Sequence, residues 1–515
     1  KVLGAVFKIP LTNMLGGVGM SYFSCAYSIF MPVYALTVTG LPAAVARIVA
    51  RSAAFGLHRN IRRIRSTAHI LFTAVGTVGS LLILALAQPF SRFSSGGTES
   101  ALAIAMIAPS VLFGCITAVE RGYYEGLSNM YPTALSQTAE GIVKVIAGLL
   151  FCGYVSAHGM ELMRRFPQIT DIRAVAAAAG ILGVTLSSAG AAVFFGVMAL
   201  FRKREPVSGD DCPMTRREIA KELAVTSLTI GCGALVTNLT AIIDMCTLIG
   251  CIRQSGYAGE LPIGVPEADL PQFIYGSFSG IALTVFNLVP SVTNMLGKGI
   301  LPCVTEAWSS GDRVCLRKNS VQGLLTAAVI AVPCAFGLGV LAPEVLGLLF
   351  SGQSDEVAVS IGALRLLMPG MVCLCVSFPL FSMMQAVGKV SAPLKIMLLG
   401  SAVKLGGNLL LIPLMGASGA GTATSVCYAV ILVTALWVYV RSAGISLEIA
   451  PFAAVLYAGA LCGVAAWLSA DICRRNGAGE LLTIALSAVF GGGVYLLSLY
   501  LLSFRRERAG FALSV

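Results

Sequence analysis

The stretch ERGYYEGLSNMYPTALSQTAEGIVKV, residues 120–145, connects two long apolar runs and carries five charged residues, in a chain where only 11% of residues are charged. Glu140 and Lys144 lie inside the second run, where Pro132 begins an expected helix over 132–153. Lys144 is twelve residues further on, about 18 Å along a helix, which is past the middle of a hydrocarbon core about 30 Å thick. A lysine at that depth costs about 2.5–3.5 kcal/mol, so we expect it to face protein or water.

The composition of the 515-residue chain indicates a membrane protein. Hydrophobic residues make up 57% of the sequence, and apolar runs near or above about 20 residues, enough to span a membrane, recur along it. Because backbone polar groups in lipid must bond within their own segment, these runs predict helices. The net charge of +11 resides mainly in short loops, as the positive-inside rule expects, and this placement argues against a nucleic-acid partner.

The apolar runs predict an all-α polytopic protein of about 14 transmembrane helices. The residues from Lys1 to the expected turn at Gly16 and Gly17 are too few to span a membrane, so we interpret them as the second half of a helix. The excess of Lys and Arg in alternate loops places both termini in the cytoplasm. The expected helices cover residues 1–15, 21–46, 69–88, 101–122, 132–153, 173–200, 223–250, 271–300, 321–342, 357–384, 392–413, 417–440, 451–470 and 481–503.

A repeat divides the chain. PTALSQTAEGIVKVIAGLL (132–150) and APLKIMLLGSAVKLGGNLL (392–410) match at an offset near 260, which also relates Pro42 to Pro302 and Lys144 to Lys404. With six helices per copy, both copies enter the membrane from the same side, which predicts two lobes in a parallel pseudo-two-fold repeat. The expected parts are an N-lobe with a truncated first helix (1–201), a cytoplasmic linker (202–222), a C-lobe (223–441), and two extra helices with a cytoplasmic tail (442–515).

Several motifs in this order resemble the multidrug/oligosaccharidyl-lipid/polysaccharide flippase superfamily, and within it the stage V sporulation protein B group, which is related to lipid II flippases. The motifs include TGLPAAVARIVA, ERGYYEGLSNMYPTALSQTAEGIVKV, LPCVTEAWSSGDRV and LMGASGAGTATS. The resemblance implies two lobes that alternate access around a central cavity, an undecaprenyl-linked sugar as cargo, and a lipid groove beside helices 13 and 14. It also suggests a role in sporulation and a place in a bacterial cytoplasmic membrane.

Basic residues within the expected helices predict a cationic cavity that binds the cargo. Lys144 and its repeat mate Lys404 are the main candidates, and the others are Lys8, Arg47 and Arg365. Three of these have ordinary alternatives, because Arg365 and Lys8 can reach the membrane surface and Arg47 can be a simple inner-loop charge. Glu140 lies one turn before Lys144, which favours a local ion pair, whereas Gly400 occupies that place before Lys404.

Three further charged residues have open assignments. Asp244 is a candidate to bind a coupling cation or proton, or to pair with Lys404 or Lys8. Arg121 and Glu306 are gate candidates. The alternative for Arg121 is an ion pair with Glu120 or Glu125, and the alternative for Glu306 is simple hydration.

No pattern in the sequence predicts a metal, a cofactor or a catalytic residue. Most of the 15 cysteines lie in apolar runs, the three histidines are scattered, and no P-loop or nucleophile motif is found. We therefore expect a monomeric transporter, in contact with membrane lipids, whose partner is a lipid-linked oligosaccharide. The alternatives are a cation-coupled drug exporter, which needs acidic cavity residues, and a membrane enzyme acting on lipid-linked glycans, which needs a large outer loop. The glycan, the energy source and the oligomeric state are left open.

Overall fold

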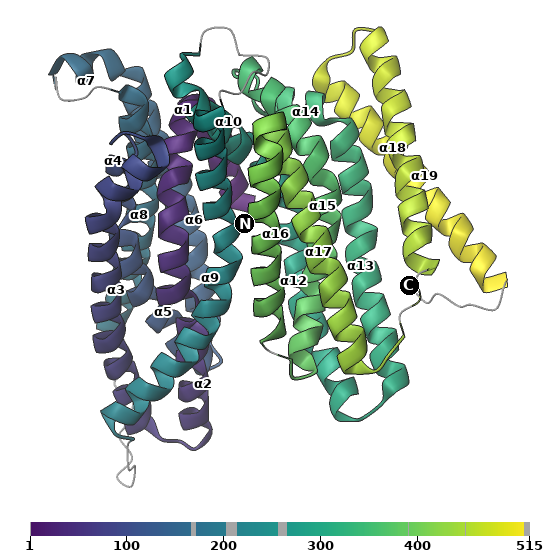
Figure 1. Ribbon diagram of the computed structural model, residues 1–515. Helices are drawn as coiled ribbons and strands as arrows, with labels where there is room; N and C mark the ends of the chain where they lie inside the picture. Colours follow the sequence, from purple (N-terminus) through teal and green to yellow (C-terminus); the bar gives the residue numbers. More distant parts are fainter. Residues whose placement is uncertain are drawn as a thin grey trace. The chain divides into compact units, whose positions relative to one another are not determined.

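The computed structural model describes residues 2–165, 171–201, 214–255, 265–389, 391–446, 448 and 450–508. Its chain forms two compact units, Lys1–Ile249 and Gly250–Val515, and each is described by itself. Within the described residues every regular element is a helix (Figure 1). Eleven of these helices are long and apolar enough to cross a membrane, or twelve if the bent pair Glu267–Phe286 and Leu288–Ser309 forms one span. The chain is thus a multi-pass helical membrane protein, and the count of fourteen spans remains a prediction.

The first unit contains nine α-helices and one π-helical segment within its described residues. They are α1 (Val2–Tyr34), the π-helical segment η1 (Ala35–Thr39), α2 (Leu41–Ala54), α3 (His58–Ser95), α4 (Ala101–Ile107), α5 (Pro109–Gly126), α6 (Tyr131–Ala157), α7 (Gly159–Arg165), α8 (Ile172–Leu200) and α9 (Arg216–Ser255). Helix α3 is longer than the predicted 69–88 because its polar first turns continue the helix beyond the apolar run. The predicted helix 101–122 is divided at Pro109, where α5 begins.

Helix α1 folds back on itself at Gly16, where the backbone leaves the helical region (φ 67°, ψ 178°). Phe7 and Phe23 are sixteen residues apart, which is about 24 Å in a straight helix, yet their ring centroids are 6.2 Å apart. The two parts of α1 therefore lie side by side, and the turn expected at Gly16 is found. A positive φ is readily adopted by glycine, which has no Cβ.

Helix α9 packs against α2, α3 and α5 of the first unit. Ile219 and Leu223 are buried in a core built with α2, α3 and α5, and a Cβ on Gly40 would lie 2.3 Å from the carbonyl oxygen of Ser227. The compact units consequently divide after Ile249, whereas the repeat places the division in the linker 202–222. Residues 202–213 of that linker lie outside the described residues, and the boundaries of the repeat remain a prediction.

The second unit contains α10 (Leu270–Ser277) to α19 (Glu480–Arg508). Between them lie α11 (Leu283–Phe286), α12 (Leu288–Ser309), α13 (Arg313–Val340), α14 (Ala342–Leu349), α15 (Ser354–Ala386), α16 (Ala392–Met415), α17 (Ala417–Ala443) and α18 (Ala450–Arg475), with η2 (Glu267–Asp269) before α10 and the π-helical segment η3 (Phe278–Ala282) after it. Asp312 begins α13 by accepting hydrogen bonds from two backbone N–H groups, at 3.0 and 2.9 Å. The last two helices, α18 and α19, pack on each other as a pair (Figure 1).

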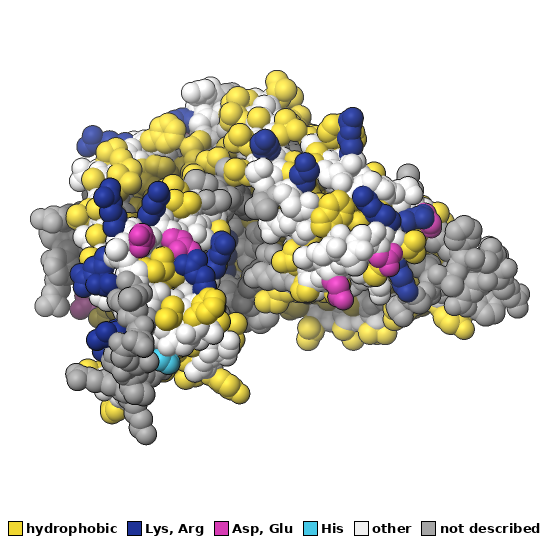
Figure 2. Space-filling view, turned by 90° about the horizontal axis from the view of Figure 1, so that it is seen from below, with side chains coloured by type: hydrophobic (Ala, Val, Ile, Leu, Met, Phe, Trp, Pro, Cys, Tyr) yellow, Lys and Arg dark blue, Asp and Glu magenta, His cyan; other side chains and the backbone are white. Residues whose placement is uncertain are grey.

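Basic side chains gather at one end of the helices in each unit (Figure 2). In the first unit this end is formed by the end of α2 and the starts of α3 and α9, and Arg51 there pairs with Glu222 at 3.1 Å. The exposed basic residues at this end include Arg51, Arg59, Arg62, Arg216 and Arg217. They are residues that the positive-inside rule assigns to inner loops, and the assignment of this end to the cytoplasm remains a prediction.

Candidate functional site

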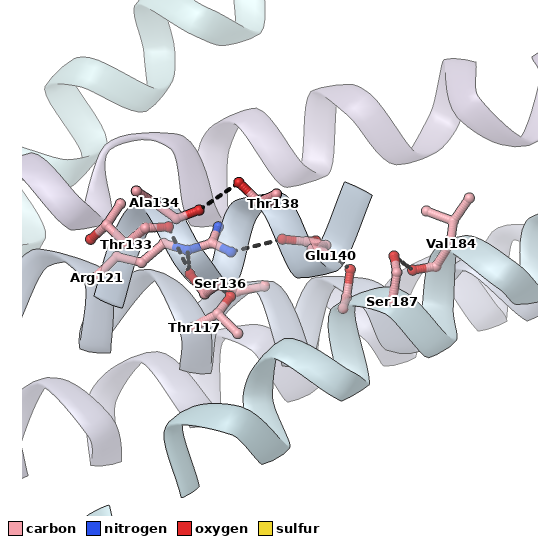
Figure 3. Close-up of polar contacts among 11 residues, drawn as sticks. Thr117, Arg121, Thr133, Ala134, Ser136, Thr138, Glu140, Val184 and Ser187 are labelled. Atoms are coloured by element: carbon pink, nitrogen blue, oxygen red, sulfur yellow. Dashed lines mark hydrogen bonds and ion pairs between the residues drawn. The ribbon is translucent and has the colours of Figure 1, made fainter. Parts of the chain in front are cut away.

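Arg121 and Glu140 form the centre of a polar network in the first unit (Figure 3). The Nη2 atom of Arg121 on α5 donates to Oε2 of Glu140 on α6 at 2.7 Å, and its Nε atom donates to the Ser136 hydroxyl at 3.1 Å. The second carboxylate oxygen of Glu140 accepts a hydrogen bond from Ser188 on α8 at 3.1 Å. The network thus joins three helices of one unit through a charge pair whose side chains are 11% and 25% exposed.

This arrangement corrects two expectations. The alternative assignment for Arg121 was an ion pair with Glu120 or Glu125, but its guanidinium is bonded to Glu140. Glu140 was expected to pair with Lys144, but both of its carboxylate oxygens are used by Arg121 and Ser188. The physical reason is that Arg121 approaches α6 from the neighbouring helix and reaches Glu140 in an almost buried position. A local pair along α6 does not form.

Lys144 instead faces the folded-back helix α1. Its ammonium lies 5.0 Å from the ring centroid of Phe7 and 5.6 Å from that of Tyr27, which are favourable cation–π distances. Lys8, one residue after Phe7, is close enough to Lys144 for their like charges to interact. The fold-back at Gly16 brings this about, because Phe7 and Tyr27 belong to the two different parts of α1.

Close helix packing sets the position of α6. A Cβ on Gly183 of α8 would lie 2.3 Å from the Cα atom of Gly148 of α6, so the two backbones are in direct contact there. This contact brings Ser188 within hydrogen-bonding distance of Glu140, and it holds the helix face that carries Lys144 against α1. Glycines at such contacts let membrane helices approach each other closely.

Two of the predicted cationic residues belong to the second unit. Lys404 on α16 is 3% exposed, and a Cβ on Gly400, one turn before it, would lie 2.4 Å from Ile431 of α17. Arg365 on α15 is exposed, and its Nε atom donates to the carbonyl oxygen of Gly339 on α13 at 3.2 Å. Arg365 therefore links two helices of its own unit.

The remaining candidates differ in exposure. Asp244 on α9 is 3% exposed, whereas Arg47 on α2 and Glu306 on α12 are exposed. The structure therefore brings Lys8, Lys144, Glu140 and Arg121 together in one unit. The single cationic cavity expected to hold Lys8, Arg47, Lys144, Arg365 and Lys404 remains a prediction, as do the roles of Asp244 and Glu306.

Sequence reasoning missed a second charged cluster. Glu120 on α5 is 3% exposed and accepts hydrogen bonds from Arg65 and His69, which both lie on α3. Arg65 and His69 are four residues apart and therefore share one face of a helix. That spacing was the available signal, but no pattern in the chain indicated Glu120 as the partner.

Comparisons with known proteins agree with this fold. The profile of the polysaccharide biosynthesis protein family matches residues 1–284, and that of the lipid II flippase MurJ matches residues 272–486. The chain is 23% identical over 540 residues to the lipid II flippase MurJ of Bacillus subtilis (strain 168), covering 99% of this chain and 94% of the relative. It is 22% identical to stage V sporulation protein B of the same organism, covering 85% of this chain and 79% of the relative.

A solved structure shares the fold. The inward closed conformation of a lipid II flippase MurJ superposes with a TM-score of 0.68 at 13% sequence identity, covering 99% of this chain and 97% of the other. The family profile covers more than half of the sequence, and both the helical fold and the order of the motifs agree with it. The chain belongs to the polysaccharide biosynthesis protein family, within the multidrug/oligosaccharidyl-lipid/polysaccharide flippase superfamily.

Proposed function

We propose that this protein moves a lipid-linked glycan precursor, carried on undecaprenyl pyrophosphate, from the inner to the outer leaflet of a bacterial cytoplasmic membrane. The observation that carries the proposal is the placement of Lys144 within electrostatic range of Lys8, with two aromatic rings close to its ammonium. The relative named lipid II flippase MurJ supports a lipid-linked cargo, and a second relative is named stage V sporulation protein B. A role in sporulation rests on the second of these names.

The chemistry of this site suits an anionic group. Two ammonium groups that repel each other are stabilised when an anion binds between them, and phosphate oxygens accept charge-assisted hydrogen bonds from lysine. The aromatic faces of Phe7 and Tyr27 hold the Lys144 ammonium by weak contacts, each worth about 0.5–2 kcal/mol. A pyrophosphate can therefore replace them at small cost, while the prenyl chain of the cargo remains in lipid.

The Arg121–Glu140 pair has a supporting role in this proposal. It joins α5, α6 and α8 within one unit, and Glu140 is one turn from Lys144 on the same helix. The pair therefore positions the part of α6 that carries Lys144 and neutralises the charge of Glu140, which would otherwise attract the ammonium. This role differs from that of a gate, in which a contact opens and closes during transport.

The experiment is transport by the purified protein in proteoliposomes, with three cargoes compared: lipid II, a teichoic-type lipid precursor and a cationic dye. We expect translocation of at least one lipid-linked glycan, and a loss of more than tenfold in the Lys144→Met variant, in which the ammonium is removed and the length of the chain is kept. Export of the dye without translocation of any lipid would refute the proposal and favour a drug exporter. Translocation by the Lys144→Met variant at the wild-type rate would remove Lys144 from the cargo site.

A further inference from the structure

Glu120, His69 and Arg65 form a buried charged cluster between α3 and α5 that the proposed transport site does not use. Oε1 of Glu120 accepts hydrogen bonds from Nε and Nη2 of Arg65 at 2.9 and 2.7 Å, and it lies 2.5 Å from Nε2 of His69. The side chain of Glu120 is 4% exposed, and that of His69 is 32% exposed. Ionisable groups within membrane helices are costly and are usually retained for a function.

The hydrogen bonds of Glu120 are unequally divided between its two oxygens. All three nitrogens approach Oε1, whereas Oε2 is buried without a hydrogen-bond partner among the described residues. A neutral imidazole has a single N–H group, and this geometry directs it from Nε2 to Glu120. The Nδ1 atom of His69 is then the atom that can take up a proton.

The charged groups around His69 determine how a proton on Nδ1 would change the net charge of the cluster. Arg65 lies on the same helix with its guanidinium 5.1 Å from the ring centroid of Tyr123, and Tyr124 is within electrostatic range of Glu120 and Arg65. The neighbouring part of α2 contributes apolar residues to the surrounding core. With His69 neutral, Arg65 and Glu120 cancel each other, and one proton taken from water to Nδ1 leaves the cluster with a net charge of +1.

Helix α5 connects this cluster to the transport site. Glu120 contacts α3, while the next residue, Arg121, contacts Glu140 and Ser136 on α6. The two faces of α5 are thus attached to different helices by charged hydrogen bonds. The hydrogen bond from neutral His69 to the Glu120 carboxylate is already charge-assisted. Protonation of His69 adds a positive charge opposite that carboxylate, which turns the contact into an ion pair and so tightens the attachment of α5 to α3.

We propose that Glu120, His69 and Arg65 form a proton-binding site in which Nδ1 of His69 takes up one proton, and that its occupancy modulates transport through α5. The inference goes beyond the proposed cargo, because the proton site is separate from Lys144 and Lys8.

The test is nitrogen NMR of the protein labelled with ¹⁵N-histidine in lipid nanodiscs, titrated with acid. The chain has three histidines, so single His→Gln variants assign each resonance, and His158→Gln is the control because His158 is exposed at the end of α6. We expect the nitrogen signals of His69 to report the uptake of one proton at Nδ1 as acid is added. The Glu120→Gln variant should bind the proton about tenfold more weakly, because the carboxylate that favours the imidazolium is lost.

A second variant, His69→Gln, is expected to fold and allows the effect of the proton on transport to be measured. His69→Gln keeps an N–H donor toward Glu120 but cannot titrate, so it should fold and should lose the pH dependence of lipid II translocation that the wild type and His158→Gln show. The proton site would be refuted if His69 stayed neutral at every pH at which the protein remains folded, or if Glu120→Gln left its proton uptake unchanged. An unaltered pH profile in His69→Gln would refute the effect on transport. The NMR result does not depend on whether lipid II is the cargo.

Discussion

A double-mutant cycle on the Arg121–Glu140 pair can decide which basic residue neutralises the charge of the Glu140 carboxylate. Removing one partner of a buried ion pair costs about 3–5 kcal/mol. The pair here is 2.7 Å long, with side chains 11% and 25% exposed, and Glu140 keeps its hydrogen bond from Ser188. Because the pair is only partly buried, we expect a cost at or just below the lower end of that range, about 2–3 kcal/mol, for Arg121→Met, and a coupling energy of about 1.5–3 kcal/mol between Arg121→Met and Glu140→Gln.

Lys144→Met provides the matched comparison. Its ammonium contacts Phe7 and Tyr27, so its removal should cost about 0.5–2 kcal/mol. Its coupling to Glu140→Gln should stay below about 0.5 kcal/mol, as for residues without a shared contact. Glu140 thus keeps its partner Arg121 in the Lys144→Met variant, in contrast to the local Glu140–Lys144 ion pair that the sequence favours.

The assay is unfolding of the purified variants in mixed micelles with increasing sodium dodecyl sulfate. A thiol-reactive dye reports the transition, because Cys115 on α5 and Cys152 on α6 are fully buried in the folded first unit. Each variant of the cycle is measured with the same dye, so differences in unfolding free energy are compared directly. A coupling above about 1.5 kcal/mol between Lys144 and Glu140, together with none between Arg121 and Glu140, would refute the network described above.

Three further predictions concern other parts of the chain. Lys404→Met should reduce translocation of lipid II in proteoliposomes more than tenfold while keeping normal expression, because Lys404 is the repeat mate of Lys144 in the predicted cationic cavity. Wild-type transport would exclude Lys404 from the cargo path. A cysteine introduced at Ser208, in the linker outside the described residues, is tested in a variant whose other accessible cysteines have been replaced. It should not react with an impermeant thiol reagent in intact cells, because basic loops remain cytoplasmic. Efficient labelling would invert the predicted topology. Gly459→Ala should lower the melting temperature by several degrees, because the new Cβ would lie 2.2 Å from Val332, and overpacking costs about 1–3 kcal/mol. Gly492→Ala, with nothing within 4 Å of the new Cβ, is its control and should melt like the wild type.

Much of the fold was predictable because apolar length and turn residues act locally. The turn at Gly16 needs a residue that tolerates positive φ, and the expected start of a helix at Pro132 agrees with α6, which begins at Tyr131. The relation of the fold to a flippase superfamily was also predictable, because the motifs keep their order along the chain. The profile and fold comparisons confirm that relation.

The ion pairs were not predictable, because they depend on how each helix is rotated about its axis. Spacing along one helix suggests Glu140 with Lys144, but the true partner, Arg121, is nineteen residues from Glu140 on another helix. The rotation of α5 is set by close contacts such as Gly122, where a Cβ would lie 2.6 Å from the carbonyl oxygen of Pro42. Contacts of this kind become visible only when the helices are packed.

The division of α5 into two differently attached faces has a consequence for how the sequence can change during evolution. Arg121 and Glu140 neutralise each other across two helices. A homologue that has lost one of these charges therefore becomes more stable when it loses the other. Glu120 depends in the same way on Arg65 and His69. Among homologous sequences, positions 121 and 140 should therefore vary together, whereas the adjacent positions 120 and 121 should vary independently of each other.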